Sequence, residues 1–217
     1  MQVVVFVGYK SSGKSTCAKI LTSMDAKVAT PDAPVGATDG GVGRYREFAF
    51  AAGVKDVAHA VFPDTDREDW EGATPASREW REREYRYGMT PRKILQLIGT
   101  EMFRDMISPD VWVNRTIDEV RSHLTMTYAS GYPGGAVIAD CRFLNEMRLV
   151  RATFGSNATF IFVHRPSISR TDDHKSEAEI EMCRASCDCE IVNDGSVDDL
   201  RRELIRILSS TWTEKKK

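Results

Sequence analysis

The stretch GYKSSGKST, residues 8 to 16, decides the fold of this chain. It matches the pattern G-x-x-x-x-G-K-[ST] in full, with Gly8, Gly13, Lys14 and Ser15 in the specified positions. The run VVVFV before it predicts a buried strand, and a helical pattern follows it. Glycines allow the backbone to turn its N–H groups inward, and the following helix adds the positive end of its dipole. The stretch therefore predicts a loop that holds the phosphates of a nucleoside triphosphate.

Three residues at the end of this loop have roles that follow from phosphate chemistry. The ammonium group of Lys14 would bridge the β- and γ-phosphates, and the hydroxyl of Ser15 would ligate Mg²⁺. The hydroxyl of Thr16 is expected to contact an α-phosphate. The donor would thus be held by one short segment of chain.

The rest of the chain alternates between strand and helix patterns. Further strands are predicted at residues 45–50, 136–140, 158–166 and 189–194. Helices are predicted at residues 14–24, 53–62, 112–125, 145–154 and, after a capping box of Ser196 and Asp199, 197–210. Such alternation predicts an α/β protein of the P-loop NTPase fold, a doubly wound, mainly parallel sheet flanked by helices. We expect one domain over residues 1–217.

Three segments depart from this regular alternation. Residues 29–43 are rich in Pro, Gly and Asp, which predicts a loop. Residues 64–86 are dense in both signs of charge, so we expect a helical surface insert at about 64–90 that contributes nothing to the core. Thr90 and Pro91 are typical of a helix start. The apolar stripe of that helix would consist of Ile94, Leu95, Ile98, Met102 and Met106.

The composition excludes several classes of protein. The chain has 217 residues, 41% of them hydrophobic, and a formal net charge of −2, which argues against general binding to a nucleic-acid backbone. No apolar run approaches the length of a membrane-spanning helix, and no signal peptide precedes the first strand. Five cysteines fit reduced thiols better than a disulfide framework. We therefore expect a cytoplasmic protein, in the host cytoplasm if it is viral.

The sequence also separates the main classes of P-loop protein. No N-K-x-D motif for guanine follows a later strand, because VNDG at 192–195 lacks the lysine. VIAD at 137–140 is followed by Cys-Arg rather than by a second acidic residue, unlike a motor ATPase. The small size and the charged insert favour a kinase that acts on a small molecule.

Two positions on the helix after Pro91 suggest a ligand, although each has a simpler explanation. Arg92 and Lys93 lie in its first turn, where cations oppose the helix dipole by roughly 0.3–1 kcal/mol each unless an anion binds there. Both side chains could instead point into water. Gly99 in mid-helix costs about 1 kcal/mol relative to Ala. Either a ligand or another helix that approaches closely would account for it.

Asp140 and Arg142 lie at the carboxyl end of a predicted parallel strand, where open α/β sheets bind their ligands. The i, i+2 spacing would place both side chains on one side of an extended chain. Asp140 could hold a water on Mg²⁺ or a sugar hydroxyl, and Arg142 could bind a phosphate through two hydrogen bonds. A structural ion pair between the two is the alternative.

Several further motifs together resemble the bacteriophage deoxynucleoside monophosphate kinases. They are TPRKILQLIGTE (90–101), DVWVNR (110–115), VIADCRFLNEM (137–147), VHRP (163–166), DDHKSE (172–177) and IVNDGSVDDL (191–200). With the phosphate loop they run in order over most of the chain, except roughly residues 25–45. The resemblance implies an enzyme that uses ATP and Mg²⁺ to phosphorylate a deoxynucleoside 5′-monophosphate. It also implies a homodimer and a lid at about residues 165–180.

The resemblance also implies a set of site residues. The donor site would comprise Lys10, Ser11, Gly13, Lys14, Ser15 and Thr16. The acceptor site would comprise Val54, Lys55, Arg78, Arg92, Lys93, Gly99, Thr100, Trp112, Asp140, Arg142 and Glu146, with Trp112 stacked on or edging the base. The catalytic charges would be those of Lys14, Asp140, Arg142, Arg165 and Arg170. Base preference is expected to depend on the loop at 29–43 and on the insert, where the chain departs from the family pattern.

The cysteines Cys183, Cys187 and Cys189 lie near His174 in a C-x3-C-x-C spacing, which is not a usual spacing for structural zinc. We interpret them as structural. Two other function classes stay open. A polynucleotide kinase would need a basic track for the strand. A non-catalytic nucleotide-binding module should lack some of Lys14, Asp140 and Arg142, and all three are present.

Overall fold

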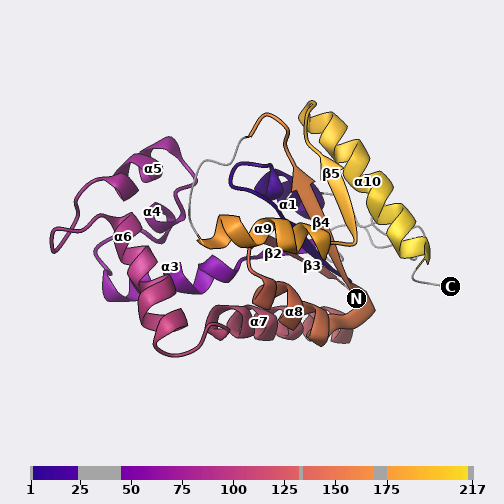
Figure 1. Ribbon diagram of the computed structural model, residues 1–217. Helices are drawn as coiled ribbons and strands as arrows, with labels where there is room; N and C mark the ends of the chain where they lie inside the picture. Colours follow the sequence, from indigo (N-terminus) through magenta and orange to yellow (C-terminus); the bar gives the residue numbers. More distant parts are fainter. Residues whose placement is uncertain (1, 24–44, 132–133, 169–174, 215–217) are drawn as a thin grey trace. The chain divides into compact units, whose positions relative to one another are not determined.

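A computed structural model describes residues 2–23, 45–131, 134–168 and 175–214 (Figure 1). The predicted loop at 29–43 and Arg170 in the predicted lid lie outside the described residues. The chain separates into two compact units, the first formed by Met1–Ala49 with Ile117–Lys217 and the second by Phe50–Thr116. Among the described residues, no helix is both long enough and apolar enough to span a membrane.

The first unit is built on a five-stranded sheet in the order β2-β3-β1-β4-β5 (Figure 1). Its strands are β1 (Gln2–Val7), β2 (Tyr45–Phe48), β3 (Gly135–Cys141), β4 (Ala158–His164) and β5 (Cys189–Val192). Every pairing is parallel, and β1 lies between β3 and β4. The predicted doubly wound, parallel sheet is therefore confirmed. β2 is shorter than predicted because the next helix already begins at Phe50.

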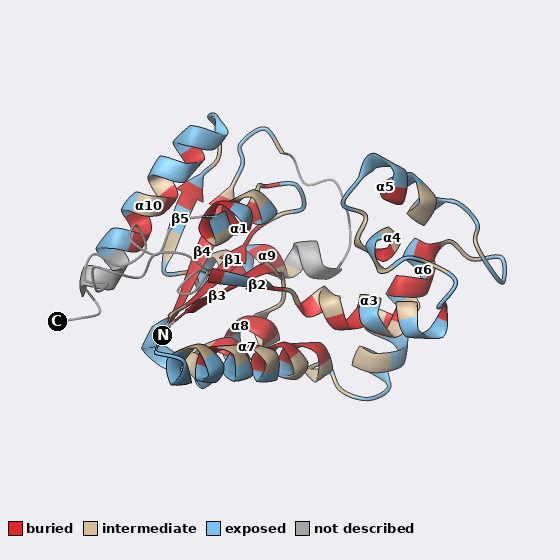
Figure 2. Cartoon of the chain, turned by 180° about the vertical axis from the view of Figure 1, so that it is seen from behind, coloured by how far each residue is buried: buried red, intermediate tan, exposed pale blue. Residues whose placement is uncertain are grey.

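Helices of the first unit cover both faces of this sheet. They are α1 (Lys14–Ser23), the greater part of α7 (Val111–Ala129), α8 (Leu144–Phe154), the 3-10 turn η2 (Gly155–Asn157), α9 (Lys175–Ala185) and α10 (Val197–Glu214). Val4 and Phe6 of β1 share one core cluster with Leu21 of α1 and Leu204 of α10. Because side chains alternate along a strand, the neighbouring valines of β1 face the other side, and they too are buried. Figure 2 shows much of the central sheet in red, the colour of buried residues. Burial on both faces explains why β1 reads as a continuous apolar run.

Two predicted helix starts are confirmed by their capping bonds. The Thr90 hydroxyl accepts a hydrogen bond from the backbone N–H of Lys93 at 3.2 Å, with Pro91 in the first helical position. At the start of α10, the Ser196 N–H donates to the Asp199 carboxylate at 2.9 Å, and the Asp199 N–H donates back to the Ser196 hydroxyl at 3.2 Å. Both caps satisfy N–H groups that the helix itself leaves unpaired.

The second unit is helical and has its own core. It contains α3 (Phe50–Val61), α4 (Arg67–Glu71), α5 (Pro75–Glu82), α6 (Pro91–Gln96), the π-helix η1 (Leu97–Asp105) and the start of α7. One cluster of buried residues joins α3, α4, α6, η1 and α7, and consists of Val54, Ala58, Phe62, Trp70, Ile94, Leu95, Ile98 and Trp112. The predicted insert at about 64–90 lies inside this unit.

The prediction that the charged segment contributes nothing to the core is wrong. Trp70 is fully buried, stacks on Phe62 with ring centres 5.8 Å apart, and meets Trp80 edge-on at 5.1 Å. Its indole N–H donates to the Thr65 hydroxyl at 2.7 Å. Many of the charged side chains between these aromatic residues pair with one another; Arg86, for example, forms an ion pair with Asp64 at 2.8 Å. Local charge pairing thus lets the aromatic residues form part of the core.

The predicted apolar stripe after Pro91 is also wrong in its second half, because the helix changes period. Met102 is 51% exposed and Met106 is 81% exposed, whereas Ile98 is buried. From Leu97 to Asp105 the helix is a π-helix, with i→i+5 hydrogen bonds. The residue that follows Ile98 on the buried face is therefore Phe103, whose ring packs 4.8 Å from that of Trp112.

Because of this change of helical period, substitutions at Ile98 and at Met106 should have very different effects on the free energy of unfolding. Ile98→Ala is expected to destabilise the protein by about 2–5 kcal/mol, because it opens a cavity in the core. Met106→Gln should change the free energy of unfolding by less than about 0.5 kcal/mol, because the side chain is already in solvent. Urea unfolding followed by circular dichroism measures both. Equal destabilisation by the two substitutions would favour a continuous α-helical stripe instead.

Candidate active site

The phosphate loop has the backbone that its sequence predicts, between β1 and α1. Gly8 has a φ of 148° and Gly13 a φ of 110°, both in a region that L side chains rarely adopt. A Cβ atom on Gly8 would lie 2.6 Å from the Val163 carbonyl oxygen. A Cβ atom on Gly13 would lie 2.4 Å from Nδ2 of Asn193. Both glycines are therefore required by conformation and by space.

Lys14 is buried within this loop. Its side chain is 6% exposed, and its Nζ donates to the carbonyl oxygens of Gly8 and Tyr9, each at 2.6 Å. A buried ammonium group is stable only when it is hydrogen-bonded, and these two carbonyl oxygens accept two of its hydrogen bonds. The Nζ of Lys14 is thus held against the backbone of the loop.

A pocket of about 380 Å³ opens at the carboxyl ends of the parallel strands of the first unit. Its lining residues come from the phosphate loop, the ends of β3, β4 and β5, and the start of α10. They are Ser11, Ser12, Gly13, Lys14, Ser15, Thr16, Ala139, Asp140, Arg142, Arg165, Asn193, Gly195, Val197 and Leu200. The structure thus brings together the predicted donor residues with Asp140, Arg142 and Arg165. Lys10 lies exposed on the same loop.

Arg142 and Arg165 line the pocket on the side formed by β3 and β4. Within the described part of the chain, neither the Arg142 nor the Arg165 guanidinium forms an ion pair, and no ion pair joins Arg142 to Asp140. The structural ion pair that the sequence left open is therefore not formed among these residues. Two guanidinium groups with Lys14 line a site that also has hydroxyl groups and a carboxylate, which suits a bound polyphosphate.

Glu146 stabilises the turn that carries Arg142. Its carboxylate is 2% exposed, and its Oε2 accepts hydrogen bonds from the backbone N–H groups of Arg142 at 2.8 Å and Phe143 at 3.1 Å. These bonds fix the turn between β3 and α8 that carries Arg142. In the structure Glu146 is therefore a capping residue of α8 that positions Arg142.

The cysteines near this turn are protonated at neutral pH. Burial raises the pKa of the Cys183 thiol to about 12, and the neighbouring Glu146 carboxylate adds to the shift. Burial and the proximity of Cys183 raise the pKa of the Cys187 thiol to about 12 as well. A thiol is a nucleophile only as a thiolate, so the raised pKa values make both thiols unreactive at neutral pH in this structure.

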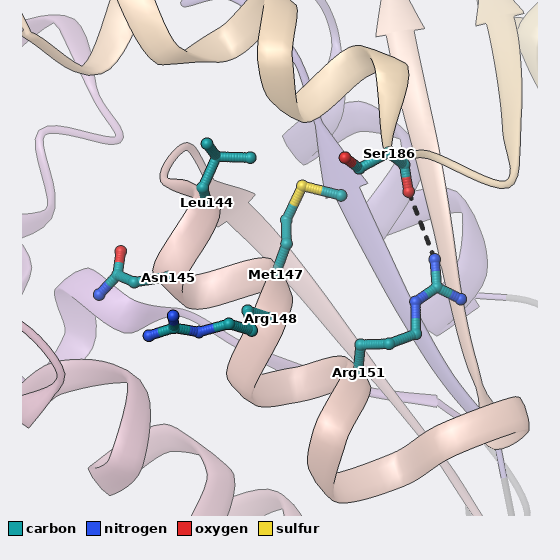
Figure 3. Close-up of a pocket in the computed structure, with 6 residues that line it drawn as sticks. All are labelled: Leu144, Asn145, Met147, Arg148, Arg151 and Ser186. Carbon is teal, nitrogen blue, oxygen red and sulfur yellow. Dashed lines mark hydrogen bonds between the residues drawn. The ribbon is translucent and has the colours of Figure 1, made fainter.

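A second hollow of about 350 Å³ lies over α8 and the end of α9, and none of its residues is a predicted site residue (Figure 3). Leu144 and Met147 supply an apolar lining. At the rim of the hollow, the guanidinium of Arg151 is already hydrogen-bonded. It donates to the Asp188 carboxylate at 2.9 Å and to the Ser186 carbonyl at 3.4 Å. We do not assign a ligand to this hollow.

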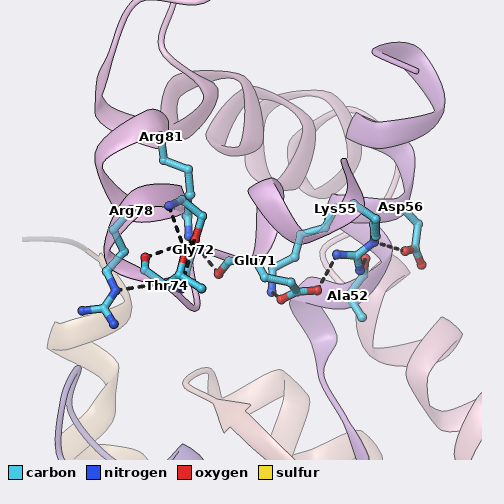
Figure 4. Close-up of polar contacts among 10 residues, drawn as sticks. Ala52, Lys55, Asp56, Glu71, Gly72, Thr74, Arg78 and Arg81 are labelled. Atoms are coloured by element: carbon cyan, nitrogen blue, oxygen red, sulfur yellow. Dashed lines mark hydrogen bonds and ion pairs between the residues drawn. The ribbon is translucent and has the colours of Figure 1, made fainter. Parts of the chain in front are cut away.

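The predicted acceptor cations of the second unit are already hydrogen-bonded. Lys55 forms an ion pair with Glu71, and Lys93 one with Glu101 at 3.2 Å. Arg92 pairs with Glu82. Arg78 has no carboxylate partner among the described residues. It donates instead to the carbonyl oxygens of Gly72 at 3.2 Å and Ala73 at 3.1 Å (Figure 4).

Glu71 is a residue of this unit that the sequence did not single out. Its carboxylate bridges Lys55 and Arg67. Figure 4 shows Glu71 beside Lys55. Partial burial raises the pKa of Glu71, but the hydrogen bonds and charges of Lys55 and Arg67 outweigh it and lower the pKa below its usual value. No local pattern indicates this role, because Lys55 and Glu71 lie on different helices.

Gly99, Val54 and Trp112 pack against one another in the second unit. A Cβ atom on Gly99 would lie 3.3 Å from a Val54 methyl group, so close helix packing accounts for this glycine. The indole N–H of Trp112 donates to the Gly99 carbonyl at 2.8 Å, and its side chain is 3% exposed. The ring is therefore a core residue in this structure, and its contact with a base stays a prediction. Thr100 is half-buried beside Gly99.

The chain is similar to several known proteins. The model of the deoxynucleotide monophosphate kinase family matches residues 54–204. An Acanthamoeba polyphaga mimivirus protein named "Putative deoxynucleotide monophosphate kinase" is 26% identical over 208 residues, which are 94% of this chain and 95% of that protein. The deoxynucleoside-5'-monophosphate kinase of Escherichia phage T5 is 32% identical over 100 residues, 44% of this chain and 37% of that protein. A dephospho-CoA kinase from Campylobacter jejuni aligns with 97% of each chain covered, a TM-score of 0.40 and 15% identity.

The family match covers more than half of the 217 residues and includes the turn that carries Asp140 and Arg142. The phosphate loop precedes the matched region and was identified from its own motif and backbone. The resemblance noted in the sequence is thereby confirmed. This chain belongs to the deoxynucleotide monophosphate kinase family and is a nucleotide kinase.

Proposed function

We propose that this enzyme transfers the γ-phosphate of ATP to a deoxynucleoside 5′-monophosphate, giving the deoxynucleoside diphosphate and ADP. The observation that supports this most is the pocket around the phosphate loop, where Lys14, Arg142 and Arg165 meet at the ends of parallel strands. The names of the two viral relatives support the class of acceptor. The reaction would take place in the cytoplasm, where both substrates are available.

In this proposal the donor site is formed by the loop and the following turn of α1. The N–H groups of the loop and the start of α1 would hold the phosphates of ATP. Mg²⁺ would be held by the Ser15 hydroxyl and, through water, by the Asp140 carboxylate, since both line the pocket and oxygen atoms are the ligands that Mg²⁺ prefers. The bound ion would neutralise charge on the transferred group.

The chain's own cations would supply the remaining catalysis. Both reactants are anions, so their approach is limited by repulsion more than by the need for a strong base. Lys14 would follow the transferred phosphoryl group, and Arg142 and Arg165 would neutralise charge on the donor and acceptor phosphates. We expect direct in-line transfer without a covalent intermediate, with Arg170 as a further cation from the lid.

The acceptor would bind through the second unit by exchange of partners. Lys55 shares the Glu71 carboxylate with Arg67, so an acceptor phosphate could replace Glu71 at Lys55 while Glu71 stays paired. Among the described residues, Arg78 donates to two carbonyl oxygens and to no carboxylate, so its charge is not compensated there. Arg92 and Lys93 would contribute in the same manner. Each of these cations is thus held in place before the substrate arrives.

The test is phosphate transfer from Mg-ATP to a panel of 5′-mononucleotides, deoxy and ribo, together with a short 5′-hydroxyl DNA oligomer. We expect one or more deoxynucleoside diphosphates as products. A Lys14→Met variant prepared in parallel controls for contaminating kinases. Phosphate on the oligomer alone would overturn the proposal in favour of a polynucleotide kinase. ATP hydrolysis with no mononucleotide accepted would overturn it as well.

A further inference from the structure

Asn193 is placed to control the backbone of the phosphate loop. It follows the last residue of β5, and its backbone N–H donates to the His164 carbonyl at 2.7 Å, which extends the pairing of β4 with β5. Its side-chain Nδ2 donates to the Ser12 carbonyl at 2.8 Å. One residue thus ties the loop to the sheet across 181 positions of sequence.

The Ser12 carbonyl belongs to the peptide group that joins Ser12 to Gly13. In a planar trans peptide the C=O and the N–H point in opposite directions. A hydrogen bond that holds the Ser12 oxygen toward Asn193 therefore turns the Gly13 N–H away from Asn193. That N–H belongs to the segment that lines the pocket.

This peptide group has few other constraints. Glycine on its C-terminal side permits many backbone angles, so the peptide can rotate easily if it is not held. The Ser12 hydroxyl is buried and has no hydrogen-bond partner among the described residues, so the side chain of Ser12 does not fix it. Asn193 also occupies the space beside Gly13, where a Cβ atom would lie 2.4 Å from Nδ2.

We propose that Asn193 is a positioning residue that locks the Ser12–Gly13 peptide, so that the Gly13 N–H is held ready for the phosphates of the donor. The inference rests on the proposed function for the identity of the donor. In addition, the affinity for the phosphate donor would depend on Asn193 in the β5–α10 turn. This residue would act by holding the loop and would not contact the nucleotide itself. The ligand class is therefore any chain of phosphates, with or without a base.

The experiment compares the wild-type chain with Asn193→Leu and Asn193→Ala. Both substitutions remove the side-chain N–H that donates to the Ser12 carbonyl, and neither adds a charge. Calorimetry measures the affinity for ATP and for inorganic tripolyphosphate, and steady-state assays measure kcat and both KM values. Asp194→Asn is the matched control, because Asp194 is exposed in the same turn and has no partner among the described residues. Thermal unfolding of every variant reports on folding.

Removal of the Asn193 side chain leaves the Ser12 carbonyl without its hydrogen bond. A loss of this kind should weaken the affinity for the phosphate ligands by about 10-fold. We expect both Asn193 variants to bind ATP and tripolyphosphate about 10-fold more weakly, to raise the KM for ATP by the same factor and to leave the KM of the acceptor unchanged. The control should stay within about 2-fold of the wild type.

Three results would overturn the inference. A loss for ATP with none for tripolyphosphate would mean that Asn193 contacts the base or sugar. Unchanged affinity for both ligands would mean that the bond is dispensable. If kcat of the Asn193 variants falls in proportion to their thermal stability while phosphate binding is unchanged, the role of Asn193 is purely structural. If the wild type binds tripolyphosphate but phosphorylates no mononucleotide, the proposed function fails while the comparison of Asn193 variants still stands.

Discussion

Lys14→Met is expected to lower kcat/KM for ATP by about 1,000-fold, with little change in the KM of the acceptor. Methionine keeps most of the length of the side chain but removes the charge that the loop encloses. The Gly8 and Tyr9 carbonyls hold the Nζ of Lys14 at 2.6 Å, so the ammonium group is already placed where the donor phosphates would bind. Steady-state assays with the preferred mononucleotide measure the loss.

Lys19→Met is the matched control, because Lys19 lies on the same helix and is exposed. It should retain wild-type activity. Removing the Nζ of Lys14 also leaves two loop carbonyls with one partner fewer, so thermal unfolding is measured for both variants. Activity of Lys14→Met within 10-fold of the wild type, which is far from the loss expected for a transition-state contact, would contradict the assigned role.

Trp70→Ala is expected to destabilise the protein by about 3–5 kcal/mol. The ring is fully buried between Phe62 and Trp80, so its removal leaves a cavity that a small helical unit cannot easily close. It also leaves the Thr65 hydroxyl without the indole N–H. Urea unfolding followed by circular dichroism measures the change, because the signal does not depend on the tryptophan that is lost.

Tyr87→Asn is the control for this substitution. Tyr87 is an aromatic residue of the same charged segment but is 78% exposed, and asparagine tolerates its φ of 56°. Its free energy of unfolding should stay within about 0.5 kcal/mol of the wild type. If Trp70→Ala were as mild as Tyr87→Asn, the aromatic cluster would not be part of the core.

Local patterns in the sequence were enough to predict the parts of the site that lie close together in the chain. The phosphate loop combines a strand, its glycines, Lys14 and a helix within a few residues, so its motif predicts its geometry. The helix starts at Thr90 and Ser196 depend on hydrogen bonds three residues apart, and both are confirmed. The strands were predicted well because burial on both faces of the sheet produces continuous apolar runs.

The errors occurred where a residue's surroundings come from distant parts of the chain. Trp70 was assigned to a surface segment because its neighbours in sequence are charged, yet those charges pair with one another. The exposed Met106 was placed in an apolar stripe because the α-helical period was carried through a π-helix. The contacts of Trp112 with Gly99 and Phe103 also come from outside its own motif, and its role at the base stays a prediction.

The fold class, the phosphate loop and the family of this protein can be predicted from the sequence, because each is specified by residue types at short, fixed spacings. The tertiary structure alone decided which side chains hold these parts in place. Asn193 reaches Ser12 across 181 positions, and Glu71 of α4 pairs with Lys55 of α3 as well as with Arg67 of its own helix. Such contacts depend on how strands and helices pack, and packing energy is set by neighbours in space, which no local period in the sequence encodes.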